Sequence, residues 1–211
     1  MSHTLLAFHG FTMNAECMRA ALEPIASALA PRVDVVCLNA PHVCAPASVE
    51  RLYRGSNAKR LPPPYLSWWD ASDDGLSYRG WEETRDLVRE ALDRYAPVSI
   101  LGFSQGAILA AAVAALAHAR ELPPIRGAVL VAGRKPRAAV LQGAFLDPIA
   151  VPSLHVWGER DSLIGPHGRE LAEQFAEAER EIVTWPGGHV LPSKGPGYEA
   201  IVRFVSEHAT G

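Results

Sequence analysis

The feature that most restricts how this chain can fold is a regular alternation of two kinds of segment. Short, continuous apolar runs alternate with longer runs that repeat apolar residues at helical spacing. The predicted strands cover residues 5–8, 33–38, 98–103, 128–132, 154–157 and 182–185, and the predicted helices cover 15–29, 81–95, 105–119, 166–178 and 197–208. Helical crossovers between parallel strands produce this alternation, and strands covered on both faces are apolar throughout. The sequence therefore predicts an α/β fold with a mostly parallel sheet of about six strands and helices on both faces.

The 211 residues suffice for one compact domain, and we expect residues 1–211 to form it because no repeat or linker divides them. The stretch 41–80 interrupts the alternation, since it has no clear period and contains three consecutive prolines at 62–64. Irregular segments of this length in compact domains are often functional. We therefore expect 41–80 to form a lid-like loop or part of a substrate pocket. A second irregular stretch covers residues 134–152.

Charge and cysteine content exclude several classes of function. The 20 basic and 23 acidic side chains are mixed along the chain, with a formal net charge of −3, so we expect no nucleic-acid partner. Cys17, Cys37 and Cys44 fit neither a disulfide framework nor a metal knuckle, and we expect reduced thiols. A signal peptide and an apolar run of membrane-spanning length are both absent from the sequence. These features predict a cytoplasmic protein without a membrane span.

Residues 102–106 read Gly-Phe-Ser-Gln-Gly, which matches the G-x-S-x-G motif of a nucleophilic serine. The motif lies between a predicted strand and a predicted helix, which is the context that it requires. A tight turn between these elements lifts the Ser104 hydroxyl from the carboxyl edge of the sheet, and it needs small residues at 102 and 106. The helix start behind the serine offers unpaired N–H groups to a developing oxyanion. Ser104 is therefore the predicted nucleophile, and the alternative is a serine that only caps the helix.

The acid and the base should follow the serine in the order acid, then histidine. Asp161 comes just after the carboxyl end of a predicted strand, where the sites of open α/β sheets collect. Glu159 is a nearby competitor, and Asp147 is a more distant one. His189 follows the last predicted strand in a glycine-containing loop that can fold toward the nucleophile. In the predicted triad His189 accepts the Ser104 proton, and Asp161 orients the imidazole and stabilises its cation.

A second amide for the oxyanion is predicted after the first strand, where residues 8–12 read Phe-His-Gly-Phe-Thr. This segment ends at the same sheet edge as the serine turn. The N–H of Phe11 can therefore meet the N–H of Gln105 around one oxygen atom. The alternative is a plain turn in which Gly10 supplies only backbone freedom.

Motifs spread over almost the whole chain resemble one known family. They are the segments at residues 5–11, 39–42, 68–69, 102–106, 157–161 and 187–189. Together they are similar to the family of serine hydrolases abbreviated FSH, which are short α/β-hydrolases related to fungal and animal esterases and thioesterases. The resemblance implies an α/β-hydrolase fold, a Ser104–Asp161–His189 triad, an oxyanion hole from Phe11 and Gln105, and ester or thioester hydrolysis without a cofactor.

The substrate is predicted to be a small ester or thioester. Tyr65, Trp68 and Trp69 are candidates for an apolar pocket, although aromatic side chains also serve to pack loops onto a domain. An acyl carrier is a candidate partner, and its docking would need a basic patch beside the pocket. The candidate residues for that patch are Arg51, Arg54, Lys59 and Arg60.

Three functions follow from these residues. Cleavage of carboxylic esters through an acyl-enzyme is the first, and thioester cleavage by the same residues is the second. A non-catalytic binding protein that keeps the fold is the third, and the presence of all three triad candidates argues against it. No motif with the spacing of metal ligands occurs in the sequence, so we expect no metal site.

Overall fold

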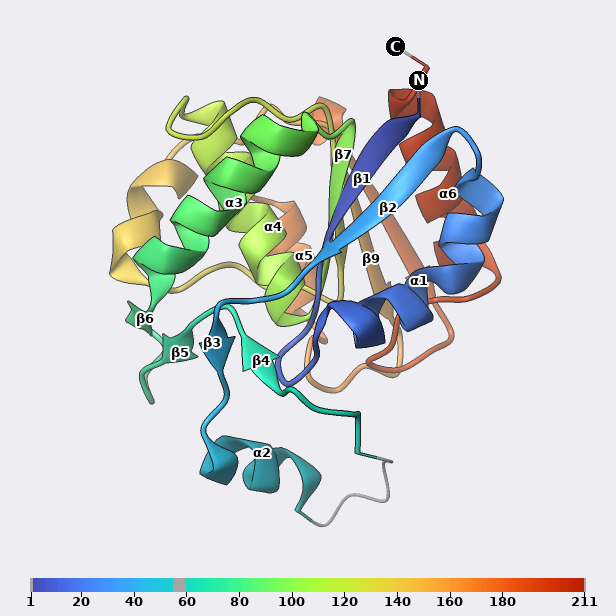
Figure 1. Ribbon diagram of the computed structural model, residues 1–211. Helices are drawn as coiled ribbons and strands as arrows, with labels where there is room; N and C mark the ends of the chain where they lie inside the picture. The colour runs from blue at the N-terminus through green and yellow to red at the C-terminus, as the bar shows by residue number, and fades with distance from the viewer. Residues whose placement is uncertain (1, 55–59, 211) are drawn as a thin grey trace.

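The computed structural model describes residues 2–54 and 60–210, and its core is a six-stranded parallel sheet (Figure 1). The strand order is β10-β9-β8-β7-β1-β2. These strands are β1 (His3–Phe8), β2 (Val33–Leu38), β7 (Ser99–Phe103), β8 (Ala128–Val131), β9 (Ser153–Gly158) and β10 (Arg180–Trp185). Every pairing between them is parallel. The predicted α/β fold with about six strands is confirmed, and the same edge of the sheet receives the carboxyl end of every strand.

Helices cover both faces of this sheet (Figure 1). One face carries α1 (Ala15–Leu29) and α6 (Pro196–His208), whose apolar side chains share a buried cluster with alternate residues of β1, β7, β8 and β9. The other face carries α3 (Trp81–Tyr95) and α4 (Gln105–His118), which share the second buried cluster. Both faces of the central strands are therefore buried, which explains why their sequences are apolar at every position.

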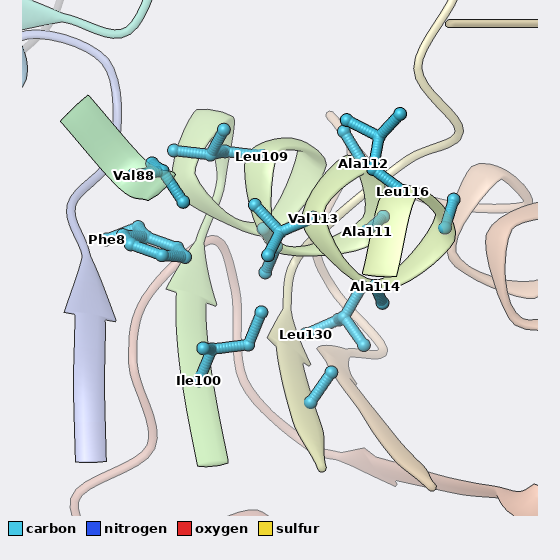
Figure 2. Packing of buried hydrophobic residues seen from close by; sticks show 14 of the residues in the cluster. Phe8, Val88, Ile100, Leu109, Ala111, Ala112, Val113, Ala114, Leu116 and Leu130 are labelled. Carbon is cyan, nitrogen blue, oxygen red and sulfur yellow. The ribbon is translucent and has the colours of Figure 1, made fainter. Parts of the chain in front are cut away.

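The helix α4 follows the serine turn directly and is the most buried helix of the described chain. Figure 2 shows Ile100 of β7 and Leu130 of β8 pointing toward α4, with Val113 and Ala114 on the facing side of the helix. Alanine fills most of the buried positions of α4, so the helix backbone can lie close to the sheet. This close packing fixes the start of α4, and with it the serine turn, against the strand edge.

The segment 41–80 is more ordered than the irregular loop that we expected. It contains the helix α2 (Pro46–Tyr53), and its short strands pair as β3 (His42–Val43) with β4 (Leu66–Ser67) and as β5 (Asp70–Ala71) with β6 (Tyr78–Arg79). Figure 1 shows α2, β3 and β4 beyond the carboxyl ends of β1 and β2. Two-residue strands are too short to produce a periodic pattern, which is why the sequence does not reveal them.

The same segment is tied to the body of the domain by Asn14, which caps α1. The Asn14 side-chain oxygen accepts a hydrogen bond from the Cys17 amide at 2.9 Å. Its nitrogen donates to the carbonyl oxygens of Pro62 and Pro64, at 3.2 and 2.9 Å. One side chain therefore starts a helix and also anchors the proline-rich part of the segment.

The helix predicted over 166–178 is shorter in the structure. α5 covers His167–Ala172, and the chain then turns to a short 3₁₀ helix at Glu177–Glu179. The intervening residues bond with Ile149, which accepts from the Ala176 amide and donates to Gln174. The Arg180 guanidinium donates to the carbonyl oxygens of Ala172 and Phe175. Tertiary hydrogen bonds thus satisfy carbonyl groups that a longer helix would have used internally.

Candidate active site

Ser104 occupies the turn between β7 and α4 with a strained backbone. Its φ of 54° and ψ of −116° lie outside the regions that side chains ordinarily adopt. A Cβ added to Gly102 would overlap the carbonyl oxygen of Gly106, and one added to Gly106 would overlap that of Phe8. Both positions therefore require glycine. The turn is held by the Ser104 amide, which donates to the Val131 oxygen of β8 at 3.0 Å.

His189 and Asp161 form a continuous chain of hydrogen bonds with Ser104. The Ser104 Oγ atom lies 2.9 Å from His189 Nε2, and Asp161 Oδ2 lies 2.8 Å from His189 Nδ1. The Asp161 side chain is fully buried, and its Oδ1 atom accepts from the amides of Leu163 and Ile164 at 3.0 and 3.2 Å. Two backbone donors therefore hold one carboxylate oxygen, and the other faces the imidazole.

The loops after β9 and β10 lie against each other, which brings Asp161 and His189 together. The Arg160 amide donates to the Gly187 oxygen at 2.9 Å, and a Cβ on Gly158 would overlap that oxygen. The competitor Glu159 is exposed, and its carboxylate lies 3.5 Å from the Thr184 hydroxyl rather than at the imidazole. Asp147 is exposed in the loop before β9. Of the three acids considered from the sequence, the structure brings Asp161 to His189.

The amides of Phe11 and Gln105 are both free to bind an additional acceptor. Phe11 follows β1, and Gln105 is the first residue of α4. Neither N–H has a hydrogen-bond acceptor within residues 2–54 and 60–210. Both residues line the same cavity as Ser104 and His189. Unpaired N–H groups at the start of a helix favour negative charge, so this arrangement can stabilise an oxyanion beside the serine.

The cavity at Ser104 has a volume of about 340 Å³ and is bounded partly by the segment 41–80. Trp69 lines it and stacks on Tyr78, with ring centroids 4.4 Å apart and 10° between the planes. The structure places the other two predicted pocket residues elsewhere. Trp68 is fully buried in the core against Phe8, and the Tyr65 hydroxyl donates to the Leu61 oxygen. Trp69 is thus the predicted aromatic residue that the structure brings to the serine.

A family model described as "Serine hydrolase (FSH1)" matches residues 1–201, which is nearly the whole chain. The chain belongs to the FSH1 serine hydrolase family. The family resemblance that the sequence motifs indicated is therefore confirmed, and it makes this protein an esterase-type hydrolase.

Relatives of this FSH1 serine hydrolase carry esterase names. The human protein named Esterase OVCA2 is 34% identical over 222 residues, which cover 97% of this chain and 96% of the human one. Among solved structures, esterase PE8 matches with a TM-score of 0.70 at 17% identity over 98% of this chain and 92% of that one. The type II thioesterase BorB matches with a TM-score of 0.64 at 16% identity, covering 99% and 93%. The two structural matches confirm the α/β-hydrolase fold.

The side chain of Gln105 has a role in this serine hydrolase that the sequence motif does not reveal. Its Oε1 atom accepts from the Trp68 amide at 3.1 Å, and its Nε2 atom donates to the Trp69 oxygen at 3.0 Å. The residue after Ser104 therefore bonds the cavity wall through both polar atoms of its side chain. The variable positions of a short motif give no signal for such a contact, because its partners lie far away in the chain.

His9 also forms hydrogen bonds that hold the part of the chain at Trp68 in place. Its Nε2 atom accepts from the Ala40 amide at 3.0 Å, so its Nδ1 atom carries the hydrogen that faces the Gly10 oxygen at 2.8 Å. Burial lowers the pKa of His9 to about 4, which keeps the ring neutral near pH 7. The indole N–H of Trp68 donates to the His9 oxygen at 2.8 Å. The end of β1 and the segment 41–80 are thereby joined next to the unpaired amides of Phe11 and Gln105.

Three of the four basic residues expected to form a patch are described by the structure, and all three lie on or beside α2. Arg51 lines the cavity, and Arg54 is exposed at the end of α2. The Arg60 guanidinium is paired with Glu50 at 2.7 Å. Lys59 lies outside the described residues. Two cavity-lining cations that were not predicted, Arg134 and Arg137, follow β8.

No cluster of three or more potential metal ligands occurs in residues 2–54 and 60–210. Across the same part of the chain, no helix combines the length and apolarity that crossing a membrane requires.

Proposed function

We propose that this protein hydrolyses carboxylic esters through an acyl-enzyme on Ser104. The observation that carries the proposal is the hydrogen-bonded chain from Ser104 through His189 to Asp161, at 2.9 and 2.8 Å. The strained turn at Ser104 and the free amides of Phe11 and Gln105 support it further. A nucleophile, an oriented base and oxyanion donors around one cavity are the parts that acyl transfer needs.

The first half of the reaction forms the acyl-enzyme. Ser104 Oγ attacks the ester carbonyl carbon while its proton moves to His189 Nε2, and the carbonyl electrons move onto the oxygen. The amides of Phe11 and Gln105 stabilise that oxyanion. When the intermediate collapses, the bond to the alcohol oxygen breaks and His189 returns the proton to it. The acyl group is then esterified to Ser104.

The second half releases the acid by the reverse sequence. Water attacks the acyl carbon as His189 accepts its proton, and a second oxyanion forms at the same amides. Ser104 then leaves and regains its proton from the imidazole. Throughout, the buried Asp161 carboxylate keeps the Nδ1 proton of His189 in place and stabilises the imidazolium.

Thioesters are a second candidate substrate class, because the same oxyanion forms when the leaving atom is sulfur. One observation favours their inclusion. Arg51, Arg134 and Arg137 line the cavity, and the thiol arm of an acyl carrier brings phosphate groups that such cations bind. Comparing the turnover of an oxygen ester and a thioester of the same acyl group separates the two classes.

The experiment that tests the proposal is intact-protein mass spectrometry after reaction with a fluorophosphonate. We expect one adduct on the wild-type protein, no adduct on Ser104→Ala, and strongly slowed labelling of His189→Ala. Ser48→Ala is the matched control, since Ser48 lines the same cavity but lies outside the hydrogen-bonded chain, and it should label like the wild type. A folded wild-type protein without an adduct would favour a binding protein instead. If the Ser104→Ala protein still formed an adduct, a residue other than Ser104 would be the nucleophile.

A further inference from the structure

The walls of the cavity at Ser104 carry an excess of positive charge. Arg51, Arg134 and Arg137 line it, and no ion pair engages these three side chains within the described part of the chain. Among the described residues, the lining contains one carboxylate, that of Asp70, which is already paired with Arg79 at 2.8 Å. A concave surface lined by one sign of charge concentrates its field and attracts ligands of the opposite sign.

The guanidinium of Arg137 is positioned by the backbone around it. Its amide donates to the Tyr78 hydroxyl at 3.0 Å, and both neighbours, Pro136 and Ala138, are buried. A Cβ on Gly75 would lie 3.3 Å from Arg137 Nη1, so the guanidinium packs directly over this glycine of the cavity wall. The buried neighbours Pro136 and Ala138 fix the backbone of Arg137, while its charged end stays exposed at the cavity.

The remaining cations come from different parts of the fold. Arg134 lies in the same segment after β8, at the carboxyl edge of the sheet. Arg51 comes from α2, where Ser48, one helical turn earlier, lines the same wall. Three guanidinium groups from two separate segments therefore converge on the space beside the nucleophile.

A second cavity continues beyond these arginines. Arg134 and Arg137 line it as well, together with Lys135, and its volume is about 550 Å³. The carboxylate of Glu170 also lines this cavity, and it is paired with His167 at 2.9 Å. The two arginines thus stand at the boundary between the nucleophile's cavity and a neighbouring basic one.

Asp74 lies within electrostatic range of Arg137 and has hydrogen-bond partners of its own. The pKa of Asp74 is lowered mainly by hydrogen bonds from the Ser72 hydroxyl and the Leu76 amide, and less by the charge of Arg137. Asp74 forms no ion pair with Arg137 within the described chain. The hydrogen bond that Arg137 donates in the described chain comes from its backbone amide, which leaves its guanidinium donors available for an anion.

We propose that Arg134 and Arg137, assisted by Arg51, bind a carboxylate or phosphate of the substrate, so that the enzyme selects acidic esters or thioesters. The inference rests on the proposed function, because it places the scissile carbonyl at Ser104. Guanidinium groups bind both anions through paired N–H donors, and a hydrogen bond to a charged group contributes more than a neutral one. The anion lies either on the acyl part, as in a half ester, or on the leaving group, as in a carrier thiol.

Two matched substrate pairs separate these sources. Monoethyl adipate and ethyl hexanoate differ by a carboxylate on the acyl chain. Hexanoyl phosphopantetheine and hexanoyl pantetheine differ by the phosphate of the thiol. Product formation by mass spectrometry gives kcat/KM for each, and the measured quantity is the ratio of the acidic to the neutral member. We expect this ratio to exceed one in at least one pair and to fall with added salt, which screens the attraction.

The variants are Arg134→Ala, Arg137→Ala and the double variant, with Arg32→Ala as the matched control. Arg32 is an exposed arginine before β2, at the opposite edge of the sheet. Each cavity variant should lower the ratio about tenfold, as expected for one lost charged hydrogen bond, and the control should keep the wild-type ratio. The pair that responds identifies the acidic part of the substrate.

An unchanged ratio in both pairs for the double variant would overturn the inference, whereas turnover of the neutral members would leave the proposed function intact. If none of the four compounds is turned over and the fluorophosphonate adduct is also absent, the proposed function fails and this inference fails with it. Thermal unfolding of each variant checks that the exposed substitutions leave the fold unchanged.

Discussion

At the scale of single residues, the hydrogen bonds of Asp161 decide how His189 is presented to the serine. The carboxylate is fully buried, and its Oδ1 atom is occupied by two backbone amides. Only Oδ2 remains for the imidazole, at 2.8 Å. In the proposed mechanism Asp161 accepts from Nδ1–H, so that Nε2 can accept the proton of Ser104.

Replacing Asp161 by asparagine tests this reading. The amide nitrogen of Asp161→Asn is able to donate to Nδ1, which places the imidazole proton on Nε2, where it blocks acceptance from the serine. We expect kcat to fall by about 10³- to 10⁴-fold with the fold retained. Glu159→Gln is the control, since this neighbouring acid is exposed, and its kcat should stay close to the wild-type value. If kcat fell equally in both variants, Asp161 would not be the acid of the triad.

Single residues also show where sequence reasoning about the site succeeds and where it stops. The motif and the chain order select Ser104, Asp161 and His189, which the structure brings together. Trp68 and Trp69 are both buried in the same core cluster, but Trp69 also lines the cavity at Ser104 and Trp68 does not. Sequence alone does not say which of the two reaches the cavity. The arginines after β8 carry no motif, so only their position in space identifies them.

At the scale of elements, α4 links the core to the active site. It begins at Gln105, directly after Ser104, and its sequence consists almost entirely of alanine and aliphatic residues. The small side chains let the helix approach β7 and β8 closely, and the resulting contacts leave little space for larger groups. The apolar pattern predicts the helix correctly because its buried positions surround the whole helix.

A larger side chain within this contact should therefore be costly. Ala114→Leu adds three carbon atoms at a fully buried position facing the sheet, and we expect the free energy of unfolding to fall by about 1–3 kcal/mol. Ala117→Leu lies on the same helix at a half-buried position and should change it by less than about 0.5 kcal/mol. Urea denaturation measures both values. Equal stability of the two variants would contradict the tight packing.

Elements that depend on tertiary contacts are harder to predict than those with their own periodicity. The short strands of the segment 41–80 and the early end of α5 are held by hydrogen bonds to distant residues, such as those of Asn14 and Arg180. Long amphipathic helices such as α1 and α3 have their expected bounds, because burial of one helical face already determines them.

At the scale of the whole molecule, two fully buried histidines couple the fold to pH. Burial lowers the pKa of His9 to about 4 and that of His155 to about 3. His155 lies in β9 and packs against Phe175. Both rings are neutral in the folded protein, whereas in the unfolded chain they bind protons below the ordinary pKa of about 6.5. The unfolded state therefore binds more protons in the acidic range, and stability must decrease as pH falls.

We expect the free energy of unfolding to be unaffected by these histidines above about pH 6.5 and to decline toward pH 4, by roughly 3 kcal/mol for His9 alone. His155→Leu removes one of the two groups, so its stability should depend less steeply on pH over this interval. Urea unfolding of the wild type and of His155→Leu measures this dependence. Values of about pH 7.5, 6, 5 and 4 span the range in which the two histidines titrate. If the free energy of unfolding depended on pH equally in the two proteins, His155 would bind protons equally in the folded and unfolded states.

The two side-chain hydrogen bonds of Gln105 limit where the substrate specificity of this enzyme can be changed. Its amide is one of the two donors proposed for the oxyanion, and its side chain binds the backbone of Trp68 and Trp69. Redesign of the wall at those tryptophans would therefore disturb the reaction centre along with the pocket. The exposed side chains of α2 and of the segment after β8 border the same space without a hydrogen bond to Gln105 in the described chain. Directed evolution of substrate range should accordingly begin at Arg51, Arg134 and Arg137.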